Sequence, residues 1–345
     1  MKNQHKQITP LRLEGPYSEE TQRLWAKKET AKGARLALNT LAAFKEIYKD
    51  EETVLSAIFN SRLAKSEDKC EGCGHPITIY YRKVVGQPAY KCKLCNKKIF
   101  PLKDTPLAKT HVRLAIIVEI IFRMFNSKGG LPANRVAEYY GIKNETAWST
   151  LHRIRKLFQL ASNNDSFLPT EEAEMDEVYI TTKNYGDPHP KKLKRGHGSQ
   201  RVTPVYTVVG RTSGVAKAYI YKHTTAQNAL EVLNRAGLTT QNPINTDESP
   251  IYSFLESNGY QHKKCHHRTY KWVGDDKGHT NSCEGLHHCL KNPLYRVYNG
   301  VSRRHLEKYL DECIFRFTKR KKTSLEMISD IFKALPPFVK TEAKL

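Results

Sequence analysis

Three acidic side chains stand at positions where a fold could bring carboxylates together. Asp176 lies in a β-rich run over 175–180, Asp247 follows a short apolar run that begins at Pro243, and Glu284 lies in a segment with helical spacing. Carboxylate oxygens are the ligands that Mg²⁺ prefers in proteins. A pair of such ions about 4 Å apart stabilises both the attacking and the leaving oxygen when a phosphodiester is cleaved or transferred. The three acids therefore predict a two-metal site, with Mg²⁺ or Mn²⁺ as cofactor.

The segment 280–294 is expected to be a helix that presents Glu284 to this site. Its polar face and its apolar face are separated: the polar positions are Asn281, Glu284, His288 and Lys291, and the apolar positions are Cys283, Leu286, Leu290 and Leu294. The apolar face would pack on a sheet. Lys291 follows Glu284 by two turns, where its ammonium could bind the phosphate of a DNA end. A single aspartate in a basic protein is more often a helix cap or an ion-pair partner, so Asp176 or Asp247 alone would be weak evidence.

Four of the eight cysteines form two closely spaced pairs, Cys70/Cys73 and Cys92/Cys95. Four thiolates in a tetrahedron are a preferred environment for zinc and leave no open position for a catalytic water. Gly74 and Asn96, which follow the two pairs, tolerate the left-handed backbone that such a knuckle requires. We therefore predict a structural zinc ribbon, the alternative being four reduced cysteines without a metal. The other cysteines (Cys265, Cys283, Cys289 and Cys313) show no ligand spacing and are expected to be reduced and buried.

Residues 134–148 have the pattern of a helix-turn-helix, with two short helices joined at Gly141 and with Asn144 as the N-cap of the second helix. Ala137, Ile142, Ala147 and Leu151 would form the apolar seam between the helices. Predicted DNA-binding residues are Asn144, Thr146 and Ser149 for base edges, and Arg153, Arg155 and Lys156 for phosphates. The alternative is an ordinary helical hairpin.

The charge balance also favours a polyanionic partner. There are 57 Lys and Arg against 35 Asp and Glu, which gives a formal net charge of +22. Such a surplus is typical of proteins that bind nucleic acid, although a ribosome-like or merely soluble basic protein would share it. A basic loop over 191–201 adds Lys194 and Arg195 as expected contacts to the DNA backbone. This loop and the tail around 319–322 could equally be solvated runs of charge.

Periodicity then suggests the elements that position these groups. Residues 1–62 and 111–160 are helix-prone, and the polar stretch 162–172 is interpreted as a linker. After residue 175, expected strands cover 177–181, 205–210, 215–221, 243–246 and 261–266, and expected helices cover 226–236, 252–258, 280–294 and 303–320. Strands followed by alternating helices and strands predict an α/β domain with a mixed sheet.

The chain is accordingly divided into five predicted segments. They are an N-terminal helical region over 1–65, a zinc ribbon over 66–104, a helix-turn-helix domain over 105–161, an α/β catalytic domain over 173–322 and a C-terminal tail over 323–345. No apolar run reaches the roughly 18 residues that a membrane-spanning helix needs, and the polar start shows no secretion signal. We therefore expect a cytoplasmic, nucleoid-associated protein without a membrane partner.

The order of zinc ribbon, helix-turn-helix and acidic α/β domain resembles the ISXO-type insertion-sequence transposases, relatives of the Merlin superfamily. The resemblance covers about 44–322. Its specific parts are Cys92-Lys-Leu-Cys95 running into Phe-Pro-Leu, the stretch from Thr146 to Arg155, Met175 to Ile180, Thr246-Asp247-Glu248, His279 to Gly285, and Gly300 to Glu312 with its trailing Phe-Arg-Phe.

The resemblance implies a ribonuclease H-like catalytic domain with a DDE-type triad followed by a lysine, at Asp176, Asp247, Glu284 and Lys291. Some relatives carry Asn as the third residue, which makes Asn281 an alternative to Glu284. An aromatic residue often follows the glutamate-glycine pair in these relatives, and this chain departs from that pattern over 286–288.

The resemblance further implies a transposase that binds the terminal inverted repeats of an insertion sequence as double-stranded DNA. It would free a 3′-hydroxyl that attacks target DNA, and it would act as a homodimer or higher oligomer on DNA. A non-enzymatic DNA-binding regulator would need only the first 160 residues. A domesticated, transposase-derived nuclease would cleave DNA without joining it. Both stay open as alternatives.

Overall fold

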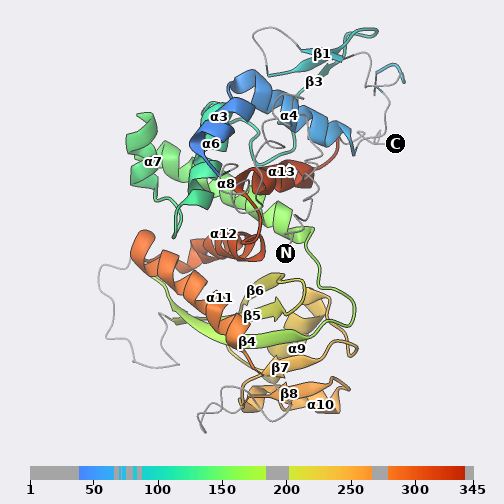
Figure 1. Ribbon diagram of the computed structural model, residues 1–345, viewed down its shortest axis with the longest axis vertical. Coiled ribbons are helices and arrows are strands. Elements are labelled where there is room, and N and C mark those ends of the chain that lie inside the picture. Colours follow the sequence, from blue (N-terminus) through green and yellow to red (C-terminus); the bar gives the residue numbers. More distant parts are fainter. Residues whose placement is uncertain are drawn as a thin grey trace, which may run out of the picture. The chain divides into compact units, whose positions relative to one another are not determined.

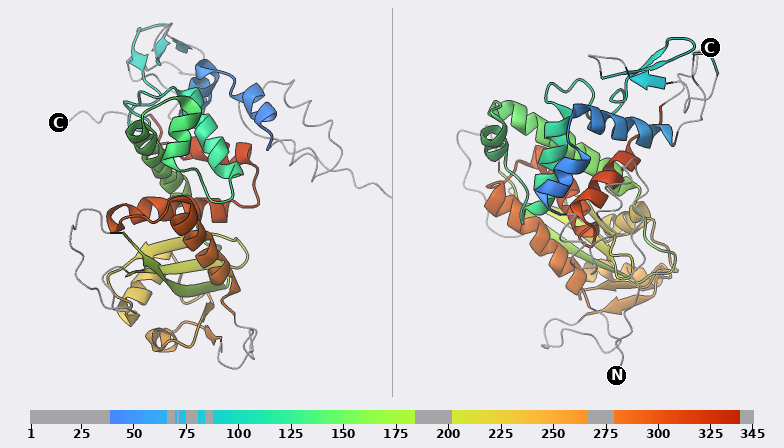
Figure 2. Two further views of the ribbon diagram at one scale, coloured as in Figure 1. Left: turned by 90° about the vertical axis from the view of Figure 1, so that its left-hand side faces the viewer. Right: turned by 45° about the horizontal axis from the view of Figure 1, so that its top comes forward.

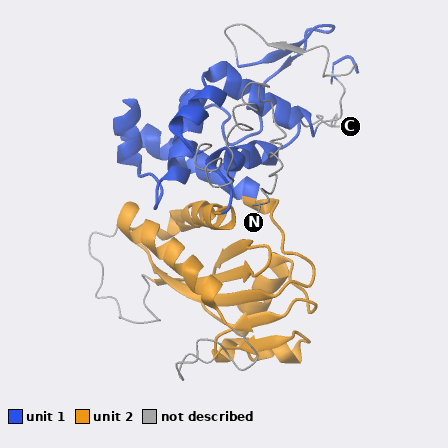
Figure 3. Cartoon of the chain, in the orientation of Figure 1, with its two compact units in different colours: residues 1–161, 321–345 blue, residues 162–320 orange. Residues whose placement is uncertain are grey.

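The computed structural model describes residues 39–65, 70, 72–74, 81–83, 88–183, 202–265 and 279–338. The chain divides into two compact units (Figure 3). The helical unit comprises Met1–Ala161 and Lys321–Leu345, and the sheet unit comprises Ser162–Arg320. Each unit is described by itself below. Within the described residues, no helix is long and apolar enough to cross a membrane.

The helical unit is built mainly from six helices among its described residues: α3 (Leu41–Ile47), α4 (Glu51–Leu63), α6 (Leu114–Asn126), α7 (Ala133–Tyr140), α8 (Asn144–Asn163) and α13 (Ser324–Ala334). α13 packs against α4 and α6. It begins with a capping box between Thr323 and Glu326, which satisfies donors at the helix start. The segment 323–345, expected to be a tail, therefore contributes a packed helix to the helical unit.

Buried polar groups of α4 tie distant segments of this unit together. Arg62 is only 1% exposed, and its guanidinium donates to the carbonyl oxygens of Pro101, Lys103, Pro336 and Pro337. At the other end of α4, the Glu51 carboxylate accepts from the amides of Leu114 and Ala115 at the start of α6. An acid at a helix N-terminus stabilises the unpaired amides there.

A three-stranded antiparallel sheet in the order β1-β2-β3 carries the second cysteine pair. Its strands are β1 (Tyr81–Lys83), β2 (Tyr90–Cys92) and β3 (Lys98–Ile99). The Tyr90 ring stacks on Phe59 of α4, with 3.9 Å between ring centroids. This contact joins the cysteine module to the helices by a small hydrophobic cluster that includes Cys70 and Cys92.

The sheet unit contains a five-stranded mixed sheet in the order β6-β5-β4-β7-β8. The strands are β4 (Ala173–Thr181), β5 (Val202–Gly210), β6 (Ala216–Ile220), β7 (Ile244–Thr246) and β8 (His262–Lys264). β4, β5 and β6 pair antiparallel, whereas β7 pairs parallel with both β4 and β8. The prediction of an α/β fold with a mixed sheet is confirmed, and this is the kind of sheet that the ribonuclease H-like interpretation requires.

Helices cover both faces of this sheet (Figures 1 and 2). One face packs on α11 (Asn281–Asn292) and α12 (Leu306–Thr318) through residues such as Val178 and Ile180. The opposite face packs on α9 (Ala226–Ala236) and α10 (Phe254–Ser257) through residues such as Met175 and Tyr206. Side chains alternate along β4, so its even-numbered residues face α11. Short turns of helix complete the unit: η1 (Pro250–Tyr252), η3 (Pro293–Val297) and η4 (Arg303–His305).

Parts of the stretch 162–172, interpreted from the sequence as a linker, pack on the sheet unit, although most of its residues are exposed. Phe167 belongs to the hydrophobic cluster on the α9 face. Glu171 is 5% exposed and accepts hydrogen bonds from the amides of Leu168, Thr212 and Ser213. Phe167 and Glu171 are therefore parts of the sheet unit, and the polar groups around Glu171 are satisfied inside the fold.

Candidate active site and metal centre

Asp176 lies in the middle of β4 on the face that α11 covers. Its side chain is 18% exposed. Oδ1 accepts a hydrogen bond of 2.8 Å from the amide of Glu177, whereas Oδ2 faces a histidine ring. The strand thus holds this carboxylate with one oxygen fixed by the backbone.

Asp247 directly follows β7, the strand that runs parallel to β4. Glu174 pairs with Asn245 in the register of these strands, so two residues further on, Asp176 and Asp247 come to the same level of the sheet. The Asp247 carboxylate accepts a 3.0 Å hydrogen bond from the Ser249 amide, which fixes the turn after the strand. The topology therefore brings these predicted ligands onto neighbouring strands.

Glu284 lies in the first turn of α11 and is exposed. The predicted separation of faces is present: Cys283, Leu286 and Leu290 are each 0% exposed and pack on the sheet. Lys291 lies in the last turn and is exposed. The alternative third residue, Asn281, is the first residue of the helix.

The three acids influence one another electrostatically. Burial, reinforced by the negative charges of Glu177, Asp247 and Glu284, raises the pKa of Asp176 to about 8. Neighbouring negative charges thus disfavour the ionised form of Asp176. A divalent cation would neutralise these charges, so the acids are suited to bind one. Among the described residues, only the zinc-module cysteines offer three or more ligand atoms that all lie within 4.8 Å of one another. The carboxylates of Asp176, Asp247 and Glu284 influence one another, but their oxygen atoms do not all lie within 4.8 Å of one another in this structure.

The sequence analysis assigned no role to His287, which the fold places directly beside Asp176. His287 Nδ1 lies 3.8 Å from Asp176 Oδ2, and Nε2 lies 2.8 Å from the hydroxyl oxygen of Thr207 on β5. The signal available in the sequence was its position three residues after Glu284 on the same predicted helix. Only the packing of α11 on β4 and β5 shows that this ring turns toward the acids.

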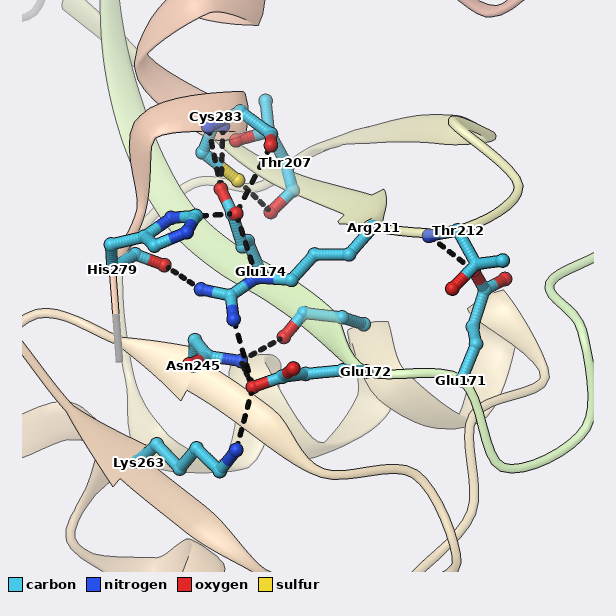
Figure 4. A network of polar contacts seen from close by, with 12 residues as sticks. Glu171, Glu172, Glu174, Thr207, Arg211, Thr212, Asn245, Lys263, His279 and Cys283 are labelled. Carbon is cyan, nitrogen blue, oxygen red and sulfur yellow. Dashed lines mark hydrogen bonds and ion pairs between the residues drawn. The ribbon is translucent and has the colours of Figure 1, made fainter. Parts of the chain in front are cut away.

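The sequence analysis also missed Glu174, which is 0% exposed and anchors the start of α11 (Figure 4). Its carboxylate accepts from the amides of Ser282 and Cys283 at 2.6 and 3.1 Å, and from the Ser282 hydroxyl at 3.0 Å. Arg211 Nε donates to the same carboxylate at 3.0 Å. Because Glu174 precedes Asp176 by two residues on β4, the bond network connects the helix of Glu284 to the strand of Asp176.

Glu172 extends this network across the parallel strands. Its Oε1 lies 2.8 Å from Arg211 Nη1 and 2.9 Å from Lys263 Nζ on β8. The side-chain amide of Asn245 on β7 donates to the same oxygen at 2.9 Å. The strand that leads to Asp247 is thus tied to its neighbours on both sides by buried or half-buried polar contacts (Figure 4).

The predicted zinc ligands Cys70, Cys73, Cys92 and Cys95 do converge. The Sγ atoms of Cys70 and Cys95 lie 3.6 Å apart, and those of Cys73 and Cys92 lie 3.7 Å apart. Thiolates about 2.3 Å from a tetrahedral zinc ion would be roughly 3.8 Å apart, whereas a disulfide would bring two sulfurs to about 2.0 Å. Gly74 and Asn96 have φ angles of 71° and 63°, as the knuckle pattern predicted. The cysteine cluster fits a structural zinc ion.

Removing zinc is therefore expected to unfold the cysteine module. Chelation, or the substitution Cys92→Ser, should release one zinc per chain and expose Phe59 and Tyr90, whose stacking depends on the module. Metal analysis and intrinsic tyrosine fluorescence measure the two effects. Cys289→Ser, at an exposed cysteine in the sheet unit, is the matched control. Retention of the metal by Cys92→Ser would contradict the ligand assignment.

The helix-turn-helix has the predicted junction. α7 ends at Tyr140, Gly141 has a φ of 62°, and α8 begins at Asn144, which is thus the first residue of the helix rather than its predicted N-cap. Val136, Ala147 and Leu151 are buried, while the predicted seam residues Ala137 and Ile142 are half-buried.

The predicted DNA-binding residues differ in how exposed their side chains are in the structure. Asn144, Ser149 and Lys156 are exposed, and Thr146 is half-buried. Arg155 is 1% exposed, so its predicted role at a phosphate is wrong for this conformation: the helix turns it into the interior. Arg153 donates to the carbonyls of Pro106 and Ala108 and is engaged in the fold. Lys194 and Arg195 lie outside the described residues. Of the predicted DNA-binding residues that the structure describes, Asn144, Ser149 and Lys156 are exposed and therefore accessible to DNA.

Of the four remaining cysteines, Cys265, Cys283 and Cys313 are buried as expected, and Cys289 is exposed. Trp148 on α8 is exposed and lies beside Asn144 and Ser149. No DNA-binding role was predicted for it from the sequence.

Comparison with known proteins identifies the sheet unit. Residues 170–318 match the family model described as the ISXO2-like transposase domain. This part of the chain is an ISXO2-like transposase domain. The matched stretch contains all of the predicted catalytic residues, namely Asp176, Asp247, Glu284 and Lys291. No curated protein matches the chain.

Solved structures that resemble the chain include viral integrases. The magnesium complex of the HTLV-2 integrase catalytic core in its dimeric form is 16% identical, with 44% of this chain and 87% of that chain covered and a TM-score of 0.28. The simian T-cell lymphotropic virus intasome with the PP2A regulatory subunit B56 gamma is 18% identical, with 52% and 63% covered and a TM-score of 0.29. The assignment of the transposase domain rests on the family match.

Proposed function

We propose that this protein is a DNA transposase that binds the terminal inverted repeats of an insertion sequence, cleaves DNA strands and joins them to target DNA. The observation that carries the proposal is the transposase-domain match over 170–318, a stretch that contains Asp176, Asp247 and Glu284. Regulators that only bind DNA have no need of this domain. Its acids, which raise the pKa of Asp176 through mutual repulsion and burial, support a metal-dependent reaction.

Asp176, Asp247 and Glu284 are the proposed ligands of Mg²⁺ or Mn²⁺. When bound, such ions supply charge stabilisation to the attacking and leaving oxygens of a phosphodiester. The protein's own contribution is to hold the ligands: β4 and the Glu177 amide fix Asp176, the Ser249 amide fixes Asp247, and Glu174 holds the helix of Glu284. Lys291, exposed two turns beyond Glu284, is proposed to bind a phosphate of the DNA end.

DNA recognition is proposed to use the helical unit. The start of α8 presents Asn144 and Ser149 to base edges, and exposed Lys156 contacts phosphate. The zinc ribbon and the net charge of +22 add affinity that does not depend on base sequence. Because two DNA ends are joined in one event, at least a dimer on DNA is proposed.

An assay on the DNA that flanks the protein's own gene tests this proposal. With Mg²⁺ or Mn²⁺, the purified full-length protein should cut at the ends of its element and join them to a second, labelled duplex. Binding without cleavage would favour a DNA-binding regulator, and cleavage without joining would favour a transposase-derived nuclease. Either outcome would overturn the proposed function.

A further inference from the structure

The ring of His287 stands between α11 and the strands that carry the acids. Its side chain is 13% exposed, and the Asp176 side chain beside it is 18% exposed. Its two ring nitrogens face different partners, Thr207 on β5 and Asp176 on β4. A neutral imidazole carries one N–H and one lone pair, and the hydrogen bonds around it determine which nitrogen carries which.

Thr207 fixes this choice. Its hydroxyl donates its single proton to the backbone carbonyl of Asp176, with 3.0 Å between the oxygens. The same hydroxyl oxygen lies 2.8 Å from His287 Nε2. Since the hydroxyl proton is already used, the oxygen must accept here, and Nε2 must carry the hydrogen. Nδ1 is therefore the ring nitrogen that stays available to a metal ion.

Nδ1 and a carboxyl oxygen of Asp176 thus face one another. Nδ1 and Asp176 Oδ2 are 3.8 Å apart, which is too long for a hydrogen bond. Two ligands about 2.2 Å from one cation are about 3 Å apart in adjacent positions and about 4.4 Å apart in opposite positions. The observed separation lies within the range that one shared cation would allow.

We propose that His287 Nδ1 is a further metal ligand, which shares with Asp176 one of the divalent cations of the active site. The inference rests on the metal site of the proposed function and adds a nitrogen donor to its carboxylates. Thr207 acts as a positioning residue, because its hydroxyl keeps the hydrogen on Nε2 and orients the ring. Imidazole suits transition metals better than Mg²⁺, so this donor selects Mn²⁺ over Mg²⁺ at that position.

Pulsed electron paramagnetic resonance on Mn²⁺ tests the proposal directly. The full-length, zinc-loaded protein, labelled with ¹⁵N in its histidine rings, is titrated with Mn²⁺, and the hyperfine coupling of a directly bound ¹⁵N is recorded. His287→Gln should lose this coupling and weaken Mn²⁺ binding at least about tenfold, with a smaller loss for Mg²⁺. His288→Gln, at the adjacent and exposed histidine, is the matched control and should retain both the coupling and the affinity.

Thr207→Val separates orientation from ligation. It should weaken Mn²⁺ binding about tenfold while the chain stays folded, because the ring loses the acceptor that fixes its tautomer. The inference is overturned if Mn²⁺ binds in an Asp176-dependent manner without a ¹⁵N coupling, or if His287→Gln retains the coupling. The metal site of the proposed function itself fails if Asp176→Asn and Asp247→Asn leave Mn²⁺ affinity unchanged, so the two failures are distinguishable.

Discussion

Asp176→Asn should abolish strand cleavage and strand joining while it leaves DNA binding intact. The amide keeps the shape of the side chain and can still accept from the Glu177 amide, but it removes the charge that a divalent cation requires. Since metal ions contribute several kcal/mol of charge stabilisation in phosphodiester chemistry, the expected loss is about a thousandfold or more in rate. Cleavage and joining are measured separately on labelled DNA ends, and binding is measured by mobility shift.

The same substitution should stabilise the metal-free protein at high pH. The pKa of Asp176 is raised from 3.8 to about 8 in the fold, so the folded state disfavours the ionised carboxylate. The Asp176 carboxyl group therefore lowers the stability of the wild-type protein without divalent ions as the pH rises from about 4 through about 8, and the Asn variant lacks this contribution. A higher Tm for Asp176→Asn at pH values above that range, together with lost activity, would show that the acid is retained for function at a cost in stability.

Asp330→Asn provides the control for this experiment. Asp330 forms an ion pair with Lys322 in the helical unit, where the two side chains are 23% and 43% exposed. Its loss should change neither the cleavage rate nor the pH dependence of stability by much, because exposed pairs contribute about 1 kcal/mol or less. Near-wild-type cleavage by Asp176→Asn would remove Asp176 from the metal site.

Local patterns in the sequence predicted the elements of the site well. The helix expected over 226–236 has those bounds in the structure, and the polar and apolar faces of α11 separate as its spacing indicated. These features depend on residues within one or two turns of each other, which periodicity records directly. The sequence predicted a mixed sheet but no strand order, so that Asp176 and Asp247 lie at the same level of the sheet is known only from the pairing of β4 with β7.

The features that were missed depend on partners far apart in the sequence. No role was predicted for Glu174, because its partners, Arg211 and Ser282, reach it only after the sheet and α11 have assembled. Arg155 is a cation like its neighbours Arg153 and Lys156, and only the rotation of α8 against its neighbours buries its side chain. The role of His287 likewise depends on the packing of α11 against β5.

Glu174→Ala should be among the most damaging substitutions in the sheet unit, although the residue touches no predicted metal ligand. It would leave the amides of Ser282 and Cys283 without their acceptor in a buried place and would remove one of the carboxylates that neutralise Arg211. Breaking a buried ion pair by removing one partner costs about 3–5 kcal/mol. Urea unfolding should report a loss of this size, and hydrogen exchange should localise the loosening to the first turn of α11.

Glu174→Gln separates the role of Glu174 in anchoring the start of α11 from its contribution to the stability of the sheet unit. The amide oxygen can still accept from one helix amide, so this variant should remain folded while the start of α11 is held less firmly. Since Glu284 lies in that turn, the expected signature is weaker divalent-ion binding with DNA binding unchanged. Glu231→Gln, whose partner Arg235 is 3.8 Å away and equally exposed at 53%, should change neither property. If Glu174→Gln matched Glu231→Gln in metal affinity, the network around Glu174 would stabilise the sheet unit without helping to position Glu284.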